Sequence, residues 1–377
     1  MRFLSEEKIE AGPDFDWDTF LKEARQERVS PLLYKRICAL DTQNILVPAR
    51  IQQSLKNDYY TQLINNAEIL RQFEEIGCSF IQEKIPFILL KGLALAGPVY
   101  QDLGLRSSQD MDILINDSDL LRANQVLGSF GYQAPFPLRD SRQFKTNRYR
   151  NALLYINRNK NKLPVHIFWH LLNLLPYHKK VNLDMQKVWS QAQKSQVGNL
   201  EVYTLDFNHQ IIYLSMHAMS HGFFPLILLV DIKELLSKQE GRIDWDELLA
   251  KAHSTGLSKH LYYGLSAAVN LTGARVPLWV LEKLKPKKIS VFEREFMDSV
   301  FKRKYFNGQE FFAYLGMNET VSDRISFLAA AFFPAREELA LIRQKDVLEV
   351  NPLDYFSRFF FGLKCALKPF PRNNLSK

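Results

Sequence analysis

Residues 87–115 read FILLKGLALAGPVYQDLGLRSSQDMDILI, and this stretch decides the predicted fold. It begins with an apolar run, 87–90, that has the length of a buried strand and ends at Lys91 and Gly92. A short helix is expected over residues 93–100, followed by a polar turn. The order strand, glycine turn, helix and turn indicates a mixed α/β arrangement around this stretch.

The end of the stretch carries two acids in a strand pattern. Residues 110–115, DMDILI, alternate with a period of two, so we expect the side chains of Asp110 and Asp112 on the same face. Two such carboxylates repel each other, and they become favourable when a hard divalent cation lies between them and a substrate phosphate. Gly92 lets the backbone approach a phosphate, and a helix start offers free N–H groups. The pattern therefore predicts a site for a metal-bound triphosphate.

These residues resemble the nucleotidyltransferase superfamily with the DNA polymerase β-like fold, whose signature is an apolar strand, Gly-Gly or Gly-Ser, a gap and Asp-x-Asp. More closely, Leu-Lys-Gly at 90–92, followed by Arg106 and the Asp110-x-Asp112 pair, resembles the bacterial uncharacterised nucleotidyltransferase family. The stretch is also similar to abortive-infection-type nucleotidyltransferase toxins. The gap from Gly92 to Asp110, 110 − 92 = 18 residues, is long for the superfamily pattern.

The resemblance implies transfer of a nucleoside monophosphate from an NTP to a hydroxyl or similar acceptor, with release of pyrophosphate. Asp110 and Asp112 would be catalytic residues and ligands of magnesium or manganese. Lys91, Gly92 and Arg106 would contact the nucleotide, with Lys91 and Arg106 either neutralising phosphate charge or bracing the turn. The acceptor stays open: a small molecule, a peptide or protein, or RNA.

A second strand pattern, LPVHIFWHL, departs from the family. The resembled family has Val-(Asp or Glu)-Leu-His-Trp here, and its acid completes the metal-binding trio. Aligning Val165, Ile167 and Trp169 with that pattern places His166 at the acid and Phe168 at the family's histidine. An imidazole can ligate a metal or accept a proton, but it supplies no negative charge.

Three hypotheses for His166 follow. Activity persists with one well-held metal and His166 as the catalytic base; the site prefers manganese or another softer ion; or the protein binds nucleotides without turnover. The third is the competing function, a catalytically weakened nucleotide sensor. An RNA-binding accessory protein is a further class, and it predicts salt-dependent RNA affinity that survives loss of both aspartates.

Composition limits the other possibilities. The chain has 377 residues, 46% hydrophobic and 24% charged, which is ordinary for a globular protein of two or three domains. It has neither a signal-peptide pattern nor an apolar run near the roughly 18 residues that span a bilayer, so we expect a cytoplasmic protein without stable membrane insertion. Three distant cysteines form neither a disulfide framework nor a zinc cluster. The net charge of +8 favours a polyanionic partner or simply a basic surface.

One helical unit is used twice. Phe15–Tyr34 and Ile243–Tyr262 align without gaps and share eight of twenty residues, including Asp-Trp-Asp at the start. Each copy is expected to form a helix, a turn and a second helix, with a structural role on one side of the core. Two copies are too few for a solenoid.

The remaining elements follow from periodicity. Helices are expected over 48–84 and 117–130 and from 244 onward with a break at Pro334, and hairpin strands around 150–157. Residues 205–236 predict two helices joined near 222–225. There His217 and His221 share one face, but Ala218 stands where zinc proteases need Glu. These histidines, and Asp231, are therefore expected to line the cleft or to be structural.

The sequence thus predicts an α+β fold: a polymerase β-like core with a small mixed sheet flanked by helices, and all-helical segments on both sides. The expected boundaries are 1–47 for the N-terminal helical segment, 48–200 for the nucleotidyltransferase core and 201–377 for the C-terminal helical domain. The aromatic-rich helix at 355–367 is expected to dock on the helical domain rather than on a membrane.

Overall fold

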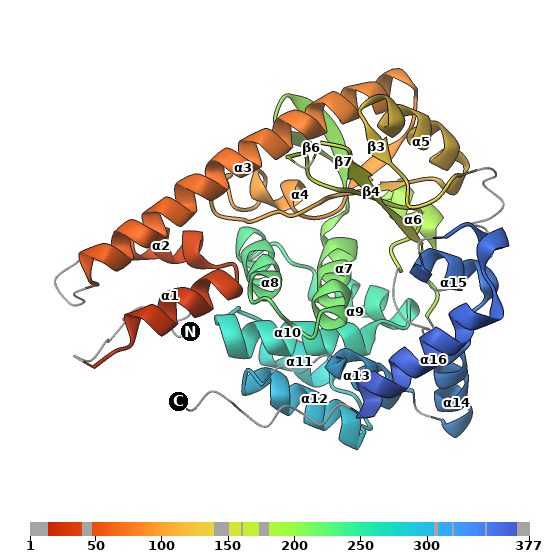
Figure 1. Cartoon of the computed structure of the whole chain (residues 1–377). Coiled ribbons are helices and arrows are strands. Elements are labelled where there is room, and N and C mark those ends of the chain that lie inside the picture. Colours follow the sequence, from red (N-terminus) through yellow and green to blue (C-terminus); the bar gives the residue numbers. More distant parts are fainter. Residues whose placement is uncertain are drawn as a thin grey trace.

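A seven-stranded mixed sheet carries the stretch described above (Figure 1). The computed structural model describes residues 14–39, 47–138, 151–159, 161–172, 181–304, 308–318, 320–343 and 345–367. The strand order is β3-β4-β5-β2-β1-β7-β6. The strands are β1 (Phe87–Leu89), β2 (Met111–Ile115), β3 (Tyr132–Gln133), β4 (Ala152–Asn157), β5 (Val165–Phe168), β6 (Gln193–Val197) and β7 (Leu200–Thr204). β1 runs antiparallel to β2 and parallel to β7, and β2 runs parallel to β5.

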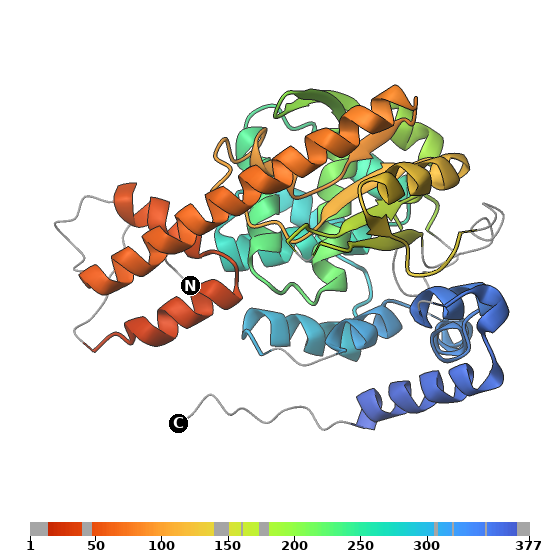
Figure 2. The ribbon, with the colours of Figure 1, turned by 45° about the horizontal axis from the view of Figure 1, so that its top comes forward.

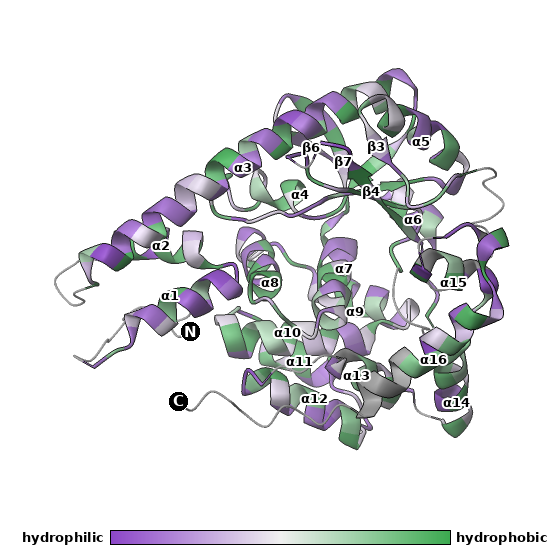
Figure 3. Ribbon diagram, in the orientation of Figure 1, coloured by the Kyte–Doolittle hydropathy of each residue, from purple (hydrophilic) through white to green (hydrophobic). Residues whose placement is uncertain are grey.

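The central strands are buried on both faces, which explains their continuous apolar runs. On one face, Leu89 and Ile113 belong to the core that includes Phe73 and Ile76 of α3 (Ala49–Gln82). On the other, Ile88 and Leu114 belong to the core formed with the helices after the sheet. In Figure 3, hydrophobic and hydrophilic segments alternate along α3, as expected for a helix with one face on the sheet and one in water.

The rest of the described chain is helical. Two helices precede α3, namely α1 (Trp17–Gln26) and α2 (Ser30–Ala39). The core adds α4 (Leu93–Ala96), the 3-10 turn Asp117–Asp119, α5 (Leu120–Ser129) and α6 (Met185–Ser190). The helices after the sheet are α7 (Phe207–Ser220), α8 (Ile227–Lys238), α9 (Trp245–Ser254), α10 (Ser258–Thr272), α11 (Leu278–Leu284), α12 (Val291–Phe301), α13 (Gln309–Met317), α14 (Val321–Phe332), α15 (Arg336–Arg343) and α16 (Pro352–Leu367), with a 3-10 turn at Val347–Glu349.

The predicted helix at 93–100 is shorter than expected. It ends as α4 at Ala96, and turns follow to residue 100. Pro98 has no N–H, so it cannot donate the next helical hydrogen bond, which accounts for the early end.

The α+β class is confirmed, and so are the repeated helical unit and the break at Pro334. Asp16 and Asp244 cap the first helices of the two copies. α16 packs against α14, with the rings of Phe359 and Phe332 5.8 Å apart (Figure 2). Within the described ranges, no helix is both long and apolar enough to cross a membrane. The proposed domain boundaries stay a prediction, and the basic residues between 139 and 150 lie outside the described residues.

Candidate active site

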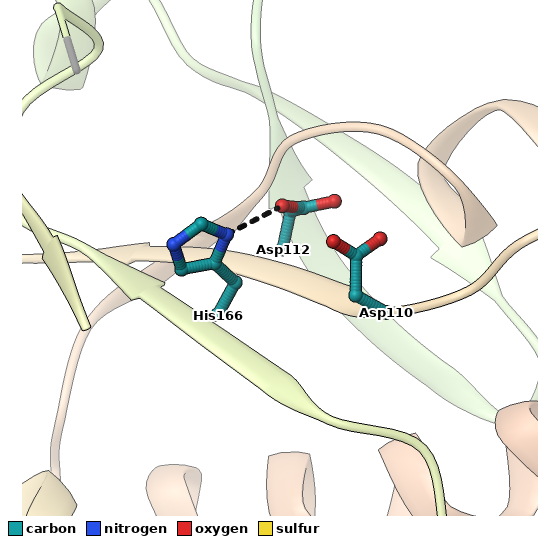
Figure 4. A group of neighbouring side chains, drawn as sticks. All are labelled: Asp110, Asp112 and His166. Atoms are coloured by element: carbon teal, nitrogen blue, oxygen red, sulfur yellow. Dashed lines mark ion pairs between the residues drawn. The ribbon is translucent and has the colours of Figure 1, made fainter. Parts of the chain in front are cut away.

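Asp110, Asp112 and His166 lie together at the centre of the sheet (Figure 4). Asp112 is in β2, Asp110 directly precedes that strand, and His166 is in β5. Because β2 and β5 are parallel neighbours with Asp112 in register with His166, the two side chains stand side by side on one face. One ligand atom from each of the three residues lies within 4.8 Å of the other two. Among the described residues, this is the group of acids and histidines spaced to hold a metal ion.

Lys91 links the β1 end to both acids. Its Nζ lies 2.5 Å from Oδ2 of Asp112 and 3.8 Å from Oδ1 of Asp110. Burial, reinforced by the charge of Asp110 and opposed by Lys91, raises the pKa of Asp112 to about 7. Burial also raises the pKa of Asp110, but the positive charges of Lys91, His166 and Arg106 together bring it below its ordinary value. The two carboxylates therefore differ: Asp110 is readily ionised, and Asp112 gains most from additional positive charge.

Gly92 makes the turn that brings this lysine to the acids. Its φ of 62° and ψ of −108° lie in a region that side chains avoid. A Cβ at this position would lie 3.1 Å from Oγ of Ser108 and 3.8 Å from the carbonyl oxygen of Asp110. Glycine therefore allows the β1–α4 turn to pack directly against the chain that leads into β2.

Arg106 is buried and held by an ion pair. It is only 6% exposed, and its Nη2 donates to Oδ2 of Asp231 in α8 at 2.7 Å. Tyr100 donates to the other carboxylate oxygen of Asp231, also at 2.7 Å. These contacts support the bracing role for Arg106, because they tie the turn before β2 to the helical part of the chain.

α7 and the residue that follows it present one row of rings to the acid pair. Tyr213, His217 and His221 follow one another four residues apart; the first two rings are stacked with centroids 6.2 Å apart, and the second pair lies 4.6 Å apart. Burial, followed by the charges of Asp112 and Asp110, raises the pKa of Tyr213 well above its ordinary value. Burial and then the charge of Lys91 hold the pKa of His217 well below its usual range and also lower that of His221. Both histidines are thus kept neutral beside the acids.

Tyr213 was not predicted as a site residue, although its position one turn before His217 is a signal that the sequence contains. His170 follows β5 and is separate from the acid cluster. Its Nδ1 accepts a hydrogen bond from the backbone N–H of Leu172 at 3.0 Å, and burial lowers its pKa. His170 therefore has a structural role at the end of the strand.

The donor set fits a divalent cation. Asp112 is 1% exposed, and its Oδ1 accepts no hydrogen bond from any described residue. A buried carboxylate oxygen without a donor is costly unless positive charge satisfies it. Two carboxylates favour hard, oxygen-binding ions, and an imidazole extends the range toward softer ones.

The sequence profile of the uncharacterised nucleotidyltransferase family matches residues 13–273, more than two thirds of the chain. The chain belongs to this uncharacterised nucleotidyltransferase family. Within the family match lie both acids, Lys91, Gly92, Arg106 and His166.

Other comparisons are more distant. A solved structure similar to this chain is the solution structure of the antibiotic-resistance factor ANT(2'')-Ia, which has 8% sequence identity, covers 50% of this chain and 93% of its own, and has a TM-score of 0.36. No curated protein matches the chain.

Proposed function

We propose that this protein is a metal-dependent nucleotidyltransferase that transfers a nucleoside monophosphate from an NTP to a hydroxyl or similar acceptor and releases pyrophosphate. The single observation that carries the proposal is the convergence of Asp110, Asp112 and His166, with ligand atoms within 4.8 Å of one another, in a chain of the nucleotidyltransferase family. The new bond joins the acceptor oxygen to the α-phosphorus, and the bond from that phosphorus to the β-phosphate oxygen breaks.

The chain's own residues have distinct roles in this proposal. Asp110 and Asp112 would hold magnesium or manganese, which when bound offsets the negative charge of the phosphates. Lys91 contributes further positive charge beside Asp112, and Gly92 keeps the turn close enough for its backbone to contact a phosphate. His166, in register with Asp112, accepts the proton of the acceptor hydroxyl.

A second candidate rests on His166 itself. Two carboxylates and a histidine supply one negative charge fewer than three carboxylates, so the second metal of a two-metal reaction is held less well. A protein of this kind binds a nucleotide and serves as a sensor. Binding without turnover distinguishes the sensor from the enzyme.

The test uses purified full-length protein, α-labelled NTPs, and magnesium or manganese. The enzyme predicts label transfer or pyrophosphate release that Asp110→Asn abolishes, because the substitution keeps the shape of the side chain and removes its charge. Asp117→Asn is a matched control: Asp117 lies two residues beyond β2 and outside the acid cluster. Metal-dependent binding of a non-hydrolysable NTP, without release of pyrophosphate, supports the sensor. Failure of both metal-dependent binding and turnover contradicts both candidates.

A further inference from the structure

Arg28 stands at a backbone position that favours glycine. It follows α1 in the turn before α2, and its φ is +56°, in the left-handed region that side chains rarely adopt. This conformation costs free energy at a residue other than glycine, and it persists where the surrounding structure holds the backbone in place.

The second copy of the helical unit has a glycine at the position that corresponds to Arg28. In the gap-free alignment, Arg28 corresponds to Gly256, whose φ is +74°. The turns are built alike: the backbone N–H of Val29 donates to the carbonyl of Ala24 at 2.9 Å, and Leu257 donates to Ala252 at 2.8 Å. The same geometry thus holds glycine in one copy and arginine in the other, so the arginine is not needed for the turn.

The turn that carries Arg28 is fixed against the C-terminal helices. Oε2 of Glu27 accepts a hydrogen bond from the backbone N–H of Leu226 at 2.6 Å, and the carbonyl oxygen of Glu27 accepts one from Ile227 at 3.2 Å. Arg303 forms an ion pair with the same carboxylate. Figure 1 shows the result: α1 and α2 lie beside α8. The backbone at Arg28 is therefore held against the start of α8.

Its guanidinium belongs to the group of charges around the acid pair. Burial lowers the pKa of Arg28 first, the charge of Arg106 lowers it further, and that of Asp110 raises it. The charge of Arg28 in turn acts on His221 in the α7–α8 connection. Arg28 is half-buried, and its side chain forms no ion pair or hydrogen bond with any residue that the structure describes. By contrast, Arg106 is paired with Asp231, and Lys91 with Asp112.

We propose that Arg28, from the N-terminal helical unit, binds a phosphate group beside Asp110. A half-buried guanidinium that has no partner among the described residues is well suited to a phosphate, since it offers several N–H donors in one plane. This inference rests on the proposed nucleotidyltransferase function for its choice of ligand. The phosphate belongs either to the triphosphate tail of the nucleotide or to an anionic acceptor.

The test compares Arg28→Gly, Arg28→Lys and wild type in binding titrations with pyrophosphate, a non-hydrolysable NTP, a nucleoside monophosphate and inorganic phosphate, all with magnesium. Arg28→Gly introduces the residue of the second copy, so its melting temperature is expected to equal or exceed that of wild type. Its affinity for a phosphate ligand is expected to fall about 10-fold or more, the effect of losing a charge-assisted hydrogen bond. Arg28→Lys is expected to retain part of the phosphate affinity that Arg28→Gly loses. Arg25→Ala is the matched control, because Arg25 lies in α1 three residues before Arg28 and is paired with Asp58.

The ligands distinguish the two sources. Weaker binding of pyrophosphate and NTP, with the monophosphate unchanged, assigns Arg28 to the triphosphate tail. Weaker binding of inorganic phosphate alone assigns it to the acceptor. Unchanged affinities, or an affinity loss accompanied by a lower melting temperature in Arg28→Gly, overturn the inference. If wild-type protein transfers no label and Asp110→Asn changes nothing, the proposed function fails, while the dependence of pyrophosphate binding on Arg28 is still measured separately.

Discussion

Arg106 and Asp231 are 125 residues apart in the chain, yet their side chains meet at 2.7 Å inside the protein, and neither is more than 7% exposed. The pair joins the turn before β2 to α8. It therefore sets the position of the acid pair relative to the row of rings on α7.

Asp231→Asn is expected to lower the free energy of unfolding by about 3–5 kcal/mol, because it leaves the buried charge of Arg106 uncompensated. Urea denaturation measures the change. Glu240→Gln is the matched control, since the pair of Glu240 and Arg275 is exposed and contributes at most about 1 kcal/mol. Equal losses in the two variants would contradict the bracing role of the buried pair.

Gly92→Ala is expected to cost about 1–3 kcal/mol of stability and to weaken nucleotide binding. The added Cβ has an unfavourable φ and lies 3.1 Å from Ser108 Oγ. Thermal denaturation and NTP titration measure the two effects. Gly97→Ala provides the comparison, because a Cβ there meets nothing within 4 Å and Gly97 has a negative φ. A tolerated Gly92→Ala variant with full nucleotide affinity would refute the close-approach argument.

His166→Asp is expected to raise the affinity for magnesium by about 10-fold or more, because it adds a negative charge in register with Asp112. The same variant without metal is expected to melt at a lower temperature, since three acids then repel one another. Calorimetric titration with magnesium and manganese measures the affinity. His166→Asn separates the effect of charge from that of an oxygen ligand. An unchanged or weaker magnesium affinity would show that position 166 does not face the ion.

Magnesium or manganese is expected to raise the melting temperature of the wild-type protein. A ligand at 100 times its dissociation constant stabilises the folded state by about 2.7 kcal/mol when it does not bind the unfolded chain. Asp110→Asn and Asp112→Asn are expected to remove the shift, whereas Asp117→Asn retains it. A shift that survives in both cluster variants would place the ion elsewhere.

Asp206 predicts a pH effect outside the candidate site. Burial raises its pKa, but hydrogen bonds and charge from His209, together with the charge of Lys251, bring it below its ordinary value. A folded pKa below the unfolded one gives stability that is present above about pH 4 and is lost as the pH falls through the folded pKa. The stability difference between wild type and Asp206→Asn should therefore shrink on acidification in urea titrations. A stability difference that does not change with pH would contradict the stabilising role of ionised Asp206. Asp246→Asn is the control, because Asp246 is exposed.

Local patterns predicted much of this fold and part of the site. Strands and helices depend mainly on residues close together in the sequence. The strands predicted from the apolar run at 87–90 and the alternation at 110–115 were confirmed, as were the helices predicted from periodicity. The strand pattern around His166 also located that residue, because matched parallel strands bring such side chains together. The proximity of Arg28 and Tyr213 to the charges of the acids was not predicted. It arises from packing between segments far apart in the chain, which hydrophobic periodicity within a segment does not reveal.

The contact between Glu27 and Arg303 joins positions 276 residues apart. Arg303 lies 303 − 273 = 30 residues beyond the end of the family match. During synthesis, the turn with Glu27 and Arg28 leaves the ribosome early, but the ion pair of Glu27 with Arg303 cannot form until residue 303 has followed. The order of translation therefore leaves the last contact of this N-terminal turn until most of the protein exists.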